Sequence, residues 1–403
     1  MLQSIFVLWV VGSLALSSGG GAGGKTPTCT AAPSGPSLEF VYRLTPGEEA
    51  VTPAAREEAA KIVCLRARSL GRTQGMVEAV GENRIRVVLP DTPAVHKLGK
   101  RIAVTGQLHF YDWEPNLIGR ERRIGGHPGV LPPRGALRSA EREWEAAGRD
   151  PRKLANQALI FAGAFPTVYG AVNLASKQKA RAGCERCSSA TPRFYMFERS
   201  PAHELIAGPV ADRSLLRRRA VGRAARALVL EVPVGTTVVS EAPIDSSGQE
   251  IAGARPGWFA LRDRPALSGE GILDPRQEVN QFNQPNVTFE FTERGRAAFE
   301  KLTRAIAARG RARAERLGGR LALSRAEELS GRFAIVFDAE VTTRPTIDFS
   351  QYPQGIDGRT GAEIAGGFVS PREARELATI LRIGALPIEM TLVRKSAVPW
   401  TGS

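Results

Sequence analysis

The feature that most constrains the fold is a regular series of elements near the start of the chain. Residues 38–43 alternate between apolar and other side chains, which is the pattern of a half-buried strand. Five further elements are predicted to follow it. They are a helix over 53–70, strands over 76–80 and 84–89, a short helix near 92–98 and a strand near 102–111.

The resulting order, β-α-β-β-α-β, is that of ferredoxin-like modules, so we predict an α+β fold. From residue 258 the periodicity is again clear: Val287, Phe289 and Phe291 alternate, and a helix is predicted after them. Ser370 and Pro371 begin another helix, Gly384 ends it, and 387–393 is a last strand. We therefore expect a ferredoxin-like base with a long inserted α+β head.

The expected organisation has six parts. They are a signal-peptide-like or anchor segment over 1–24, a linker over 25–36, a base over 37–112 completed by 385–394, a divergent insertion over 113–258, a head over 259–384 and a tail over 395–403.

The apolar run 5–16 is shorter than the roughly 20 residues that a membrane span needs. It suits the apolar core of a secretory signal, because small residues where a peptidase could cut follow it at 17–24. No lysine or arginine precedes it. The alternatives are an uncleaved anchor and a start codon misplaced inside a longer first membrane helix. We expect export, either to the outer face of the plasma membrane or as a secreted protein.

The chain has four cysteines, Cys29, Cys64, Cys184 and Cys187. An even number in an exported chain is compatible with two disulfides. Cys184 and Cys187 form a C-x-x-C in a Gly/Ser-flanked segment, for which a structural disulfide or two free thiols in a loop is favoured. A metal site and a redox role are the alternatives, and a single C-x-x-C does not decide between them.

The motif search favours no catalytic function. The histidines are scattered, and no H-E-x-x-H, G-x-S-x-G or Walker sequence is present. We therefore expect no enzyme and no cofactor. The sequence Asn286-Val287-Thr288 matches a glycosylation sequon, which is a frequent chance match.

The formal net charge of +14 is carried mostly by arginine. Two clusters stand out: Arg217, Arg218, Arg219, Arg223 and Arg226, and Arg309, Arg311, Arg313, Arg316 and Arg320. Contact with nucleic acid or with lipid headgroups is one interpretation, and a solvated helix face is the other. Because no aromatic residues are interleaved to stack on bases, nucleic acid is not expected as a partner, whereas contact with a membrane surface stays open.

Several motifs follow one another in a fixed order. Those of the early part are 81–90 and 105–115, and those of the late part are 262–269, 283–292, 333–338, 347–349, 364–368 and 384–387. Together they resemble the first extracytoplasmic domain, with its base and head, of SecD, a subunit of the bacterial protein-export translocase. The resemblance implies a domain that contacts emerging preproteins and swings on its base, beside SecF and the translocase channel.

The departures from SecD limit what can be transferred. The L-D-L-x-G-G-type segment of the family is replaced by Gly35-Pro36-Ser37-Leu38 and the residues after it, and the chain stops where SecD enters a bundle of membrane helices. The family's proton-coupling residues lie in that bundle, so this chain alone is not expected to couple protons.

We expect peptide contact in a groove of the head, with paired strands and exposed apolar side chains. The candidates are Phe289, Phe291, Phe337 and Phe368, with Phe333 nearby in sequence, although most of these could simply be core. Candidate turn or hinge glycines are Gly366, Gly367 and Gly384, and the chain is expected to cross between base and head near 113–114 and 383–384.

Two functions follow from these expectations. The first is a SecD-like accessory factor in protein translocation. The second is an exported, non-enzymatic binding module with a SecD-like fold, which would bind envelope polymers or peptides. A third interpretation is an incomplete gene model whose membrane half is missing.

Overall fold

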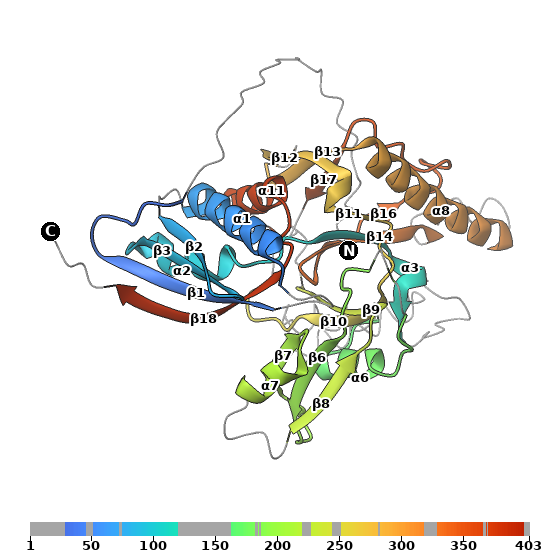
Figure 1. The fold of residues 1–403 in the computed structure, drawn as a ribbon. Helices are drawn as coiled ribbons and strands as arrows, with labels where there is room; N and C mark the ends of the chain where they lie inside the picture. Colours follow the sequence, from blue (N-terminus) through green and yellow to red (C-terminus); the bar gives the residue numbers. More distant parts are fainter. Residues whose placement is uncertain are drawn as a thin grey trace. The chain divides into compact units, whose positions relative to one another are not determined.

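The computed structural model describes residues 29–45, 51–71, 75–119, 163–181, 184, 187–219, 227–243, 251–280, 283–317, 329–365, 368 and 370–398. This part of the chain forms helices and strands, and the strands belong to several sheets (Figure 1), which confirms the predicted α+β class. The leader 1–24 and the candidate turn glycines Gly366 and Gly367 lie outside the described residues.

The described residues divide into two compact units. The inserted unit is Leu108–Ala374, and the terminal unit combines residues 29–107 with residues 375–398. The chain therefore passes between the units at residues 107–108 and again at 374–375.

The terminal unit is built on a four-stranded sheet in the order β18-β1-β3-β2, in which every neighbouring pair is antiparallel. The strands are β1 (Ser37–Thr45), β2 (Met76–Val80), β3 (Arg84–Pro90) and β18 (Glu389–Val398). The apolar face expected for β1 is borne out, since Phe40, Tyr42 and Leu44 are fully buried in one apolar cluster. The strand is more than half-buried, however, because Glu39 and Val41 on the other face are only 7% and 8% exposed. Helices α1 (Pro53–Gly71) and α2 (Pro93–Arg101) supply the other side of that cluster.

One strand of the expected series lies elsewhere. The strand predicted near 102–111 is β4 (Leu108–Asp112), and it pairs with β14 (Gly331–Phe337) and β11 (Leu267–Ser268) in the inserted unit. The edge of β1 that this strand would have needed is occupied by β18 over its full length. Sequence periodicity identifies a strand but does not say which partner it pairs with.

The open face of the terminal sheet carries a ladder of alternating charges across all four strands. From β2 to β18 its members are Glu78, Arg86, Glu39 and Arg394. Arg86 donates to Glu78 at 2.8 Å and to Glu39, and Arg394 donates to the other oxygen of Glu39. Only 9% of the Glu39 side chain is exposed, and the hydrogen bond from Arg86 is the main cause that lowers the pKa of this carboxyl.

Arg66 of α1 is fully buried and contacts two segments of the terminal unit, residues 102–105 and Gly384. Its guanidinium donates to the carbonyls of Ile102 and Val104, to that of Thr105 and to that of Gly384. Gly384 ends α11 (Pro371–Ile383) at φ +99°, a left-handed conformation that favours glycine. One side chain thus holds together segments about 280 positions apart.

The inserted unit contains an eight-stranded sheet with the path β11-β4-β14-β15-β9-β10-β5, to which β16 (Thr346–Ile347) adds at β14. Besides β4, β11, β14 and β16, this sheet contains β5 (Leu117–Ile118), β9 (Thr236–Glu241), β10 (Gly257–Arg262) and β15 (Glu340–Thr343). Strands β14 and β15 form a hairpin, and its turn residues Asp338 and Ala339 both have positive φ.

Two smaller sheets complete the inserted unit. One has the order β12-β13-β17, with β12 (Ile272–Val279), β13 (Pro285–Phe291) and β17 (Ala362–Ala365). The other has the order β7-β6-β8, with β6 (Arg193–Glu198), β7 (Leu205–Val210) and β8 (Ala227–Val232). The described helices with these sheets are α3 (Trp113–Asn116), α6 (Val168–Ala175), α7 (Arg213–Arg219) and α8 (Glu293–Leu317).

Candidate functional site

The phenylalanines predicted for a peptide groove lie mainly in an aromatic cluster inside the inserted unit. Phe289 and Phe333 are 3% and 0% exposed. The ring of Phe289 is 6.1 Å from that of Phe110 and 5.5 Å from that of Phe291, and Phe291 stacks on Phe299 of α8 at 4.7 Å. Phe289 therefore packs in the core and is not a surface contact, because its face of β13 is covered.

The remaining groove candidates are placed differently. Phe337, at the end of β14, and Phe368, after β17, are both half-buried. Of the four candidates, Phe289 and Phe291 are in ring contact in the described part of the chain, and a groove lined jointly by all four stays a prediction.

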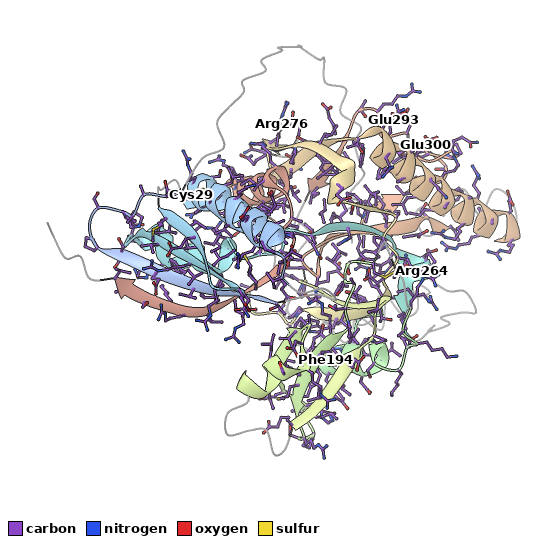
Figure 2. The ribbon with its side chains drawn as sticks, viewed as in Figure 1. Cys29, Phe194, Arg264, Arg276, Glu293 and Glu300 are labelled. Atoms are coloured by element: carbon purple, nitrogen blue, oxygen red, sulfur yellow. A yellow bond between two sulfur atoms is a disulfide. The ribbon has the colours of Figure 1, made fainter. Side chains whose placement is uncertain are left out.

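The surface of this unit carries apolar side chains that the sequence analysis missed. Leu273 and Val279 on β12 are 48% and 53% exposed, and Leu205 on β7 is 40% exposed. A bulge between Leu273 and Arg276 shifts the pairing, so that Leu273 lies opposite Glu290 and Val279 opposite Pro285. These positions belong to opposite faces of the sheet, so the two side chains do not form one patch. Arg276, beside the bulge, is labelled in Figure 2.

The polar face of the β12-β13-β17 sheet contains a buried amide beside a carboxyl group. Asn286 is 2% exposed, and its Nδ2 donates to Glu363 Oε2 at 2.5 Å. Its Oδ1 has no hydrogen-bond partner among the described residues. Burial is the main cause that raises the pKa of Glu363, and the charge of Glu278 adds to it. The sequon at Asn286 is thus inaccessible to a glycosyltransferase once the chain has folded.

The second arginine cluster is largely part of a structural network. Arg309, Arg311, Arg313 and Arg316 of this cluster lie on α8, which extends to Leu317. Arg309 donates to Asp112 and Glu114, and Arg313 donates to Glu114 and to the carbonyl of Leu329. Because carboxylates already neutralise these two arginines, they are poor candidates for holding an anionic polymer. Arg320, Arg223, Arg226 and the side chains of 217–219 lie outside the described residues.

All four cysteines are in disulfides. Cys29 is bonded to Cys64 of α1, and Cys184 is bonded to Cys187. Cys29, labelled in Figure 2, lies in the expected linker, yet it is 9% exposed and its carbonyl accepts from the amide of Val77 on β2. The segment before β1 is thus fixed to the terminal unit.

Next to the second disulfide lies a buried carboxylate, Asp263, which is 1% exposed. The Tyr111 hydroxyl donates to its Oδ1 at 2.7 Å, and the Ser188 amide and hydroxyl both donate to its Oδ2 at 2.8 Å. Burial is the first cause that raises the pKa of Tyr111 and lowers the pKa of His109, both on β4. Burial thus favours the neutral forms of both side chains.

The candidate hinge positions fall inside the two units. Gly384 lies in the terminal unit, where Arg66 holds its carbonyl. Trp113 lies in the inserted unit, 5% exposed, with its ring 4.9 Å from that of Phe259. The divisions at 107–108 and 374–375 therefore differ from the expected crossings at 113–114 and 383–384.

Membrane-spanning helices and metal-binding groups would each indicate a further function. Within the described ranges, no helix is both long and apolar enough to span a membrane. No group of three or more histidine, cysteine, aspartate or glutamate side chains is arranged to hold a metal ion in that same part of the chain.

Comparisons with known proteins point to one family. Residues 245–388 match the family described as SecDF, P1 head subdomain. The chain is 31% identical over 134 residues to protein translocase subunit SecDF of Thermus thermophilus, covering 33% of this chain and 14% of that protein. It is 28% identical over 152 residues to SecD of Aquifex aeolicus, covering 37% and 24%. The chain thus spans less than a quarter of the length of either relative.

A solved structure of the membrane component SecDF, described as enhancing protein export, aligns with 88% of this chain and 98% of its own, at 20% identity and a TM-score of 0.41. Separately from that alignment, the resemblance to SecD that the sequence motifs carry is confirmed over residues 245–388, which are similar to the P1 head subdomain of SecD and SecDF proteins.

Proposed function

We propose that this chain is a SecD-like accessory factor in protein translocation across the plasma membrane. Its inserted unit would contact preprotein segments at the extracytoplasmic face. The match of residues 245–388 to the SecDF P1 head is the observation that supports this most directly. SecF and the Sec translocase channel are the partners proposed with it, and the proposed role is not enzymatic.

Because Phe289 and Phe333 are buried, we propose the contact at other apolar side chains of the inserted unit. Leu273 is an exposed apolar side chain on the edge strand β12, next to Ile272, whose pairing with Phe291 begins the ladder. Phe368 is half-buried and follows β17, the opposite edge strand of the same sheet. An extended segment that lies across this sheet would bury apolar side chains at these positions, a weak and sequence-tolerant mode of binding.

The test is site-specific photo-crosslinking in intact cells. A photo-reactive residue is placed at Leu273 or at Phe368 while an export substrate is stalled in transit. The matched control is Leu205, which is also an exposed leucine on a strand but lies outside the matched residues. Capture of the stalled substrate from 273 or 368, and not from 205, is expected.

Two results would contradict the proposal. Equal capture at the control position would show non-specific proximity. Capture of envelope polymer alone would favour an exported binding module, although the ion pairs of Arg309 and Arg313 with carboxylates weigh against polymer binding there.

A further inference from the structure

Cys184, Cys187 and Ser188 all contact one buried residue, Asp263. The Sγ atoms of Cys184 and Cys187 lie 3.9 and 3.2 Å from the carbonyl oxygen of Asp263. Disulfide sulfur has no hydrogen to donate, so these are packing contacts. Ser188, the next residue, donates two of the three hydrogen bonds that the Asp263 carboxylate accepts from the described residues. The disulfide and the carboxylate therefore form one local structure.

The position of Ser188 depends on the disulfide. Its amide follows Cys187 directly, and Cys187 is fixed by the bond to Cys184 and by its contact with Asp263. Two thiols need more room than one disulfide, because sulfur atoms that are not bonded cannot approach to bonding distance. Opening the bond would displace at least one of the two half-buried sulfurs, and a displacement of Cys187 would move Ser188 with it.

The consequence for Asp263 is large. Without Ser188, a carboxylate that is 1% exposed keeps only the hydrogen bond from the Tyr111 hydroxyl, out of the three that it accepts from the described residues. A buried charge that loses its hydrogen bonds is strongly disfavoured, so the protein must readjust around Asp263 when the disulfide opens. Disulfide formation and the docking of Ser188 are therefore coupled, and the coupling is reciprocal.

We propose that Cys184–Cys187 is a thiol–disulfide exchange site whose reduction releases the Ser188 loop from Asp263. The reactant is a protein or small molecule of the dithiol class. Its thiolate attacks Cys184 Sγ, the sulfur farther from Asp263; the Cys184–Cys187 bond breaks and Cys187 leaves as a thiolate. The second thiol of the reductant then displaces Cys184, which forms the reductant's disulfide. Two electrons and two protons pass to the cysteines.

The first measurement uses the intact protein and the dithiothreitol couple. Thiols are trapped by alkylation at a series of ratios of reduced to oxidised reagent, and each disulfide is quantified by mass spectrometry. Cys184–Cys187 should open at ratios that leave Cys29–Cys64 closed, because the latter includes a buried cysteine tied to β2. Hydrogen exchange at the Ser188 amide should become fast in the same range.

A matched pair of variants tests the coupling. Ser188→Ala removes one donor to a charged acceptor, so the equilibrium constant for reduction of Cys184–Cys187 should rise about tenfold or more. Ser189→Ala removes a hydroxyl of the same loop that donates to the carbonyl of Thr191, and should leave that constant unchanged. In Cys184→Ala/Cys187→Ala, the reductant should no longer alter exchange at Ser188.

Three outcomes would overturn the proposal. The pair could resist reduction at ratios that open Cys29–Cys64. The Ser188 amide could keep its protection after Cys184–Cys187 has opened. The two serine variants could show the same reduction constant as the native protein.

Discussion

Replacement of Arg66 by methionine should destabilise the terminal unit selectively. Methionine keeps the apolar stem but removes every guanidinium hydrogen bond. Two of the four bonds to backbone carbonyls are long, at 3.3 and 3.4 Å, and two are short, to Val104 and to Gly384. A hydrogen bond from a charged donor contributes about 1.5–3 kcal/mol. The two short bonds alone predict a loss of about 3–6 kcal/mol, a large part of the stability of a typical domain.

The assay is hydrogen exchange followed by mass spectrometry, because it reports each unit separately. Protection should fall in peptides from β1 and α1 and should be retained in β14 of the inserted unit. Arg68→Met is the control, since Arg68 is an exposed residue on the same helix and its replacement should change stability by less than about 0.5 kcal/mol. If Arg66→Met cost less than about 1 kcal/mol, the carbonyls would be satisfied without it and the argument would fail.

Three further predictions concern other parts of the molecule. Replacing Cys29 and Cys64 by alanine opens a closed loop of 35 positions and should lower the unfolding free energy by about 4 kcal/mol, measured by urea denaturation; no change would show that the segment before β1 is held by other contacts. Because the pKa of Glu39 is lowered, its stabilising effect is complete above the usual carboxyl range and is lost as the pH falls through the lowered value. The difference in unfolding free energy between the native protein and Glu39→Gln should therefore shrink towards acid pH, by about 1.4 kcal/mol for each pH unit by which the pKa is lowered. A difference that does not change with pH would refute this. Gly295→Ala should destabilise the start of α8, because a Cβ there would lie 2.0 Å from the carbonyl oxygen of Gly271; an unchanged melting temperature would mean that the helix can shift without cost.

Local features of the fold could be read directly from the sequence. The first strand, the first helix and the 76–90 hairpin lie where the patterns predict them. The start of α11 carries the expected cap, since the Ser370 hydroxyl accepts from the Glu373 amide at 3.4 Å. These predictions succeed because each depends on residues within a few positions of one another.

Features that depend on distant partners could not be predicted. Alternation in β13 indicates an apolar face, but it does not say whether a peptide or α8 covers that face, so the sequence alone leaves Phe289 as a groove candidate. The sequence cannot show that the arginines at the end of α8 are paired, because their carboxylate partners lie nearly 200 positions earlier, in Asp112 and Glu114. Cys29 reads as linker because its partner and its backbone contact both come later in the chain.

The pairing of β1 with β18 sets an order on biosynthesis. Ser37 lies opposite Val398, so the sheet of the terminal unit cannot be completed until residue 398 has left the ribosome. Leu108–Ala374, whose contacts lie mostly within that range, can fold earlier. Contacts of such large sequence separation form slowly, and β1 meanwhile presents an unpaired edge. A nascent chain of this kind would need protection from aggregation until β18 has been made, and truncation before residue 389 should yield an insoluble product even though the inserted unit is intact.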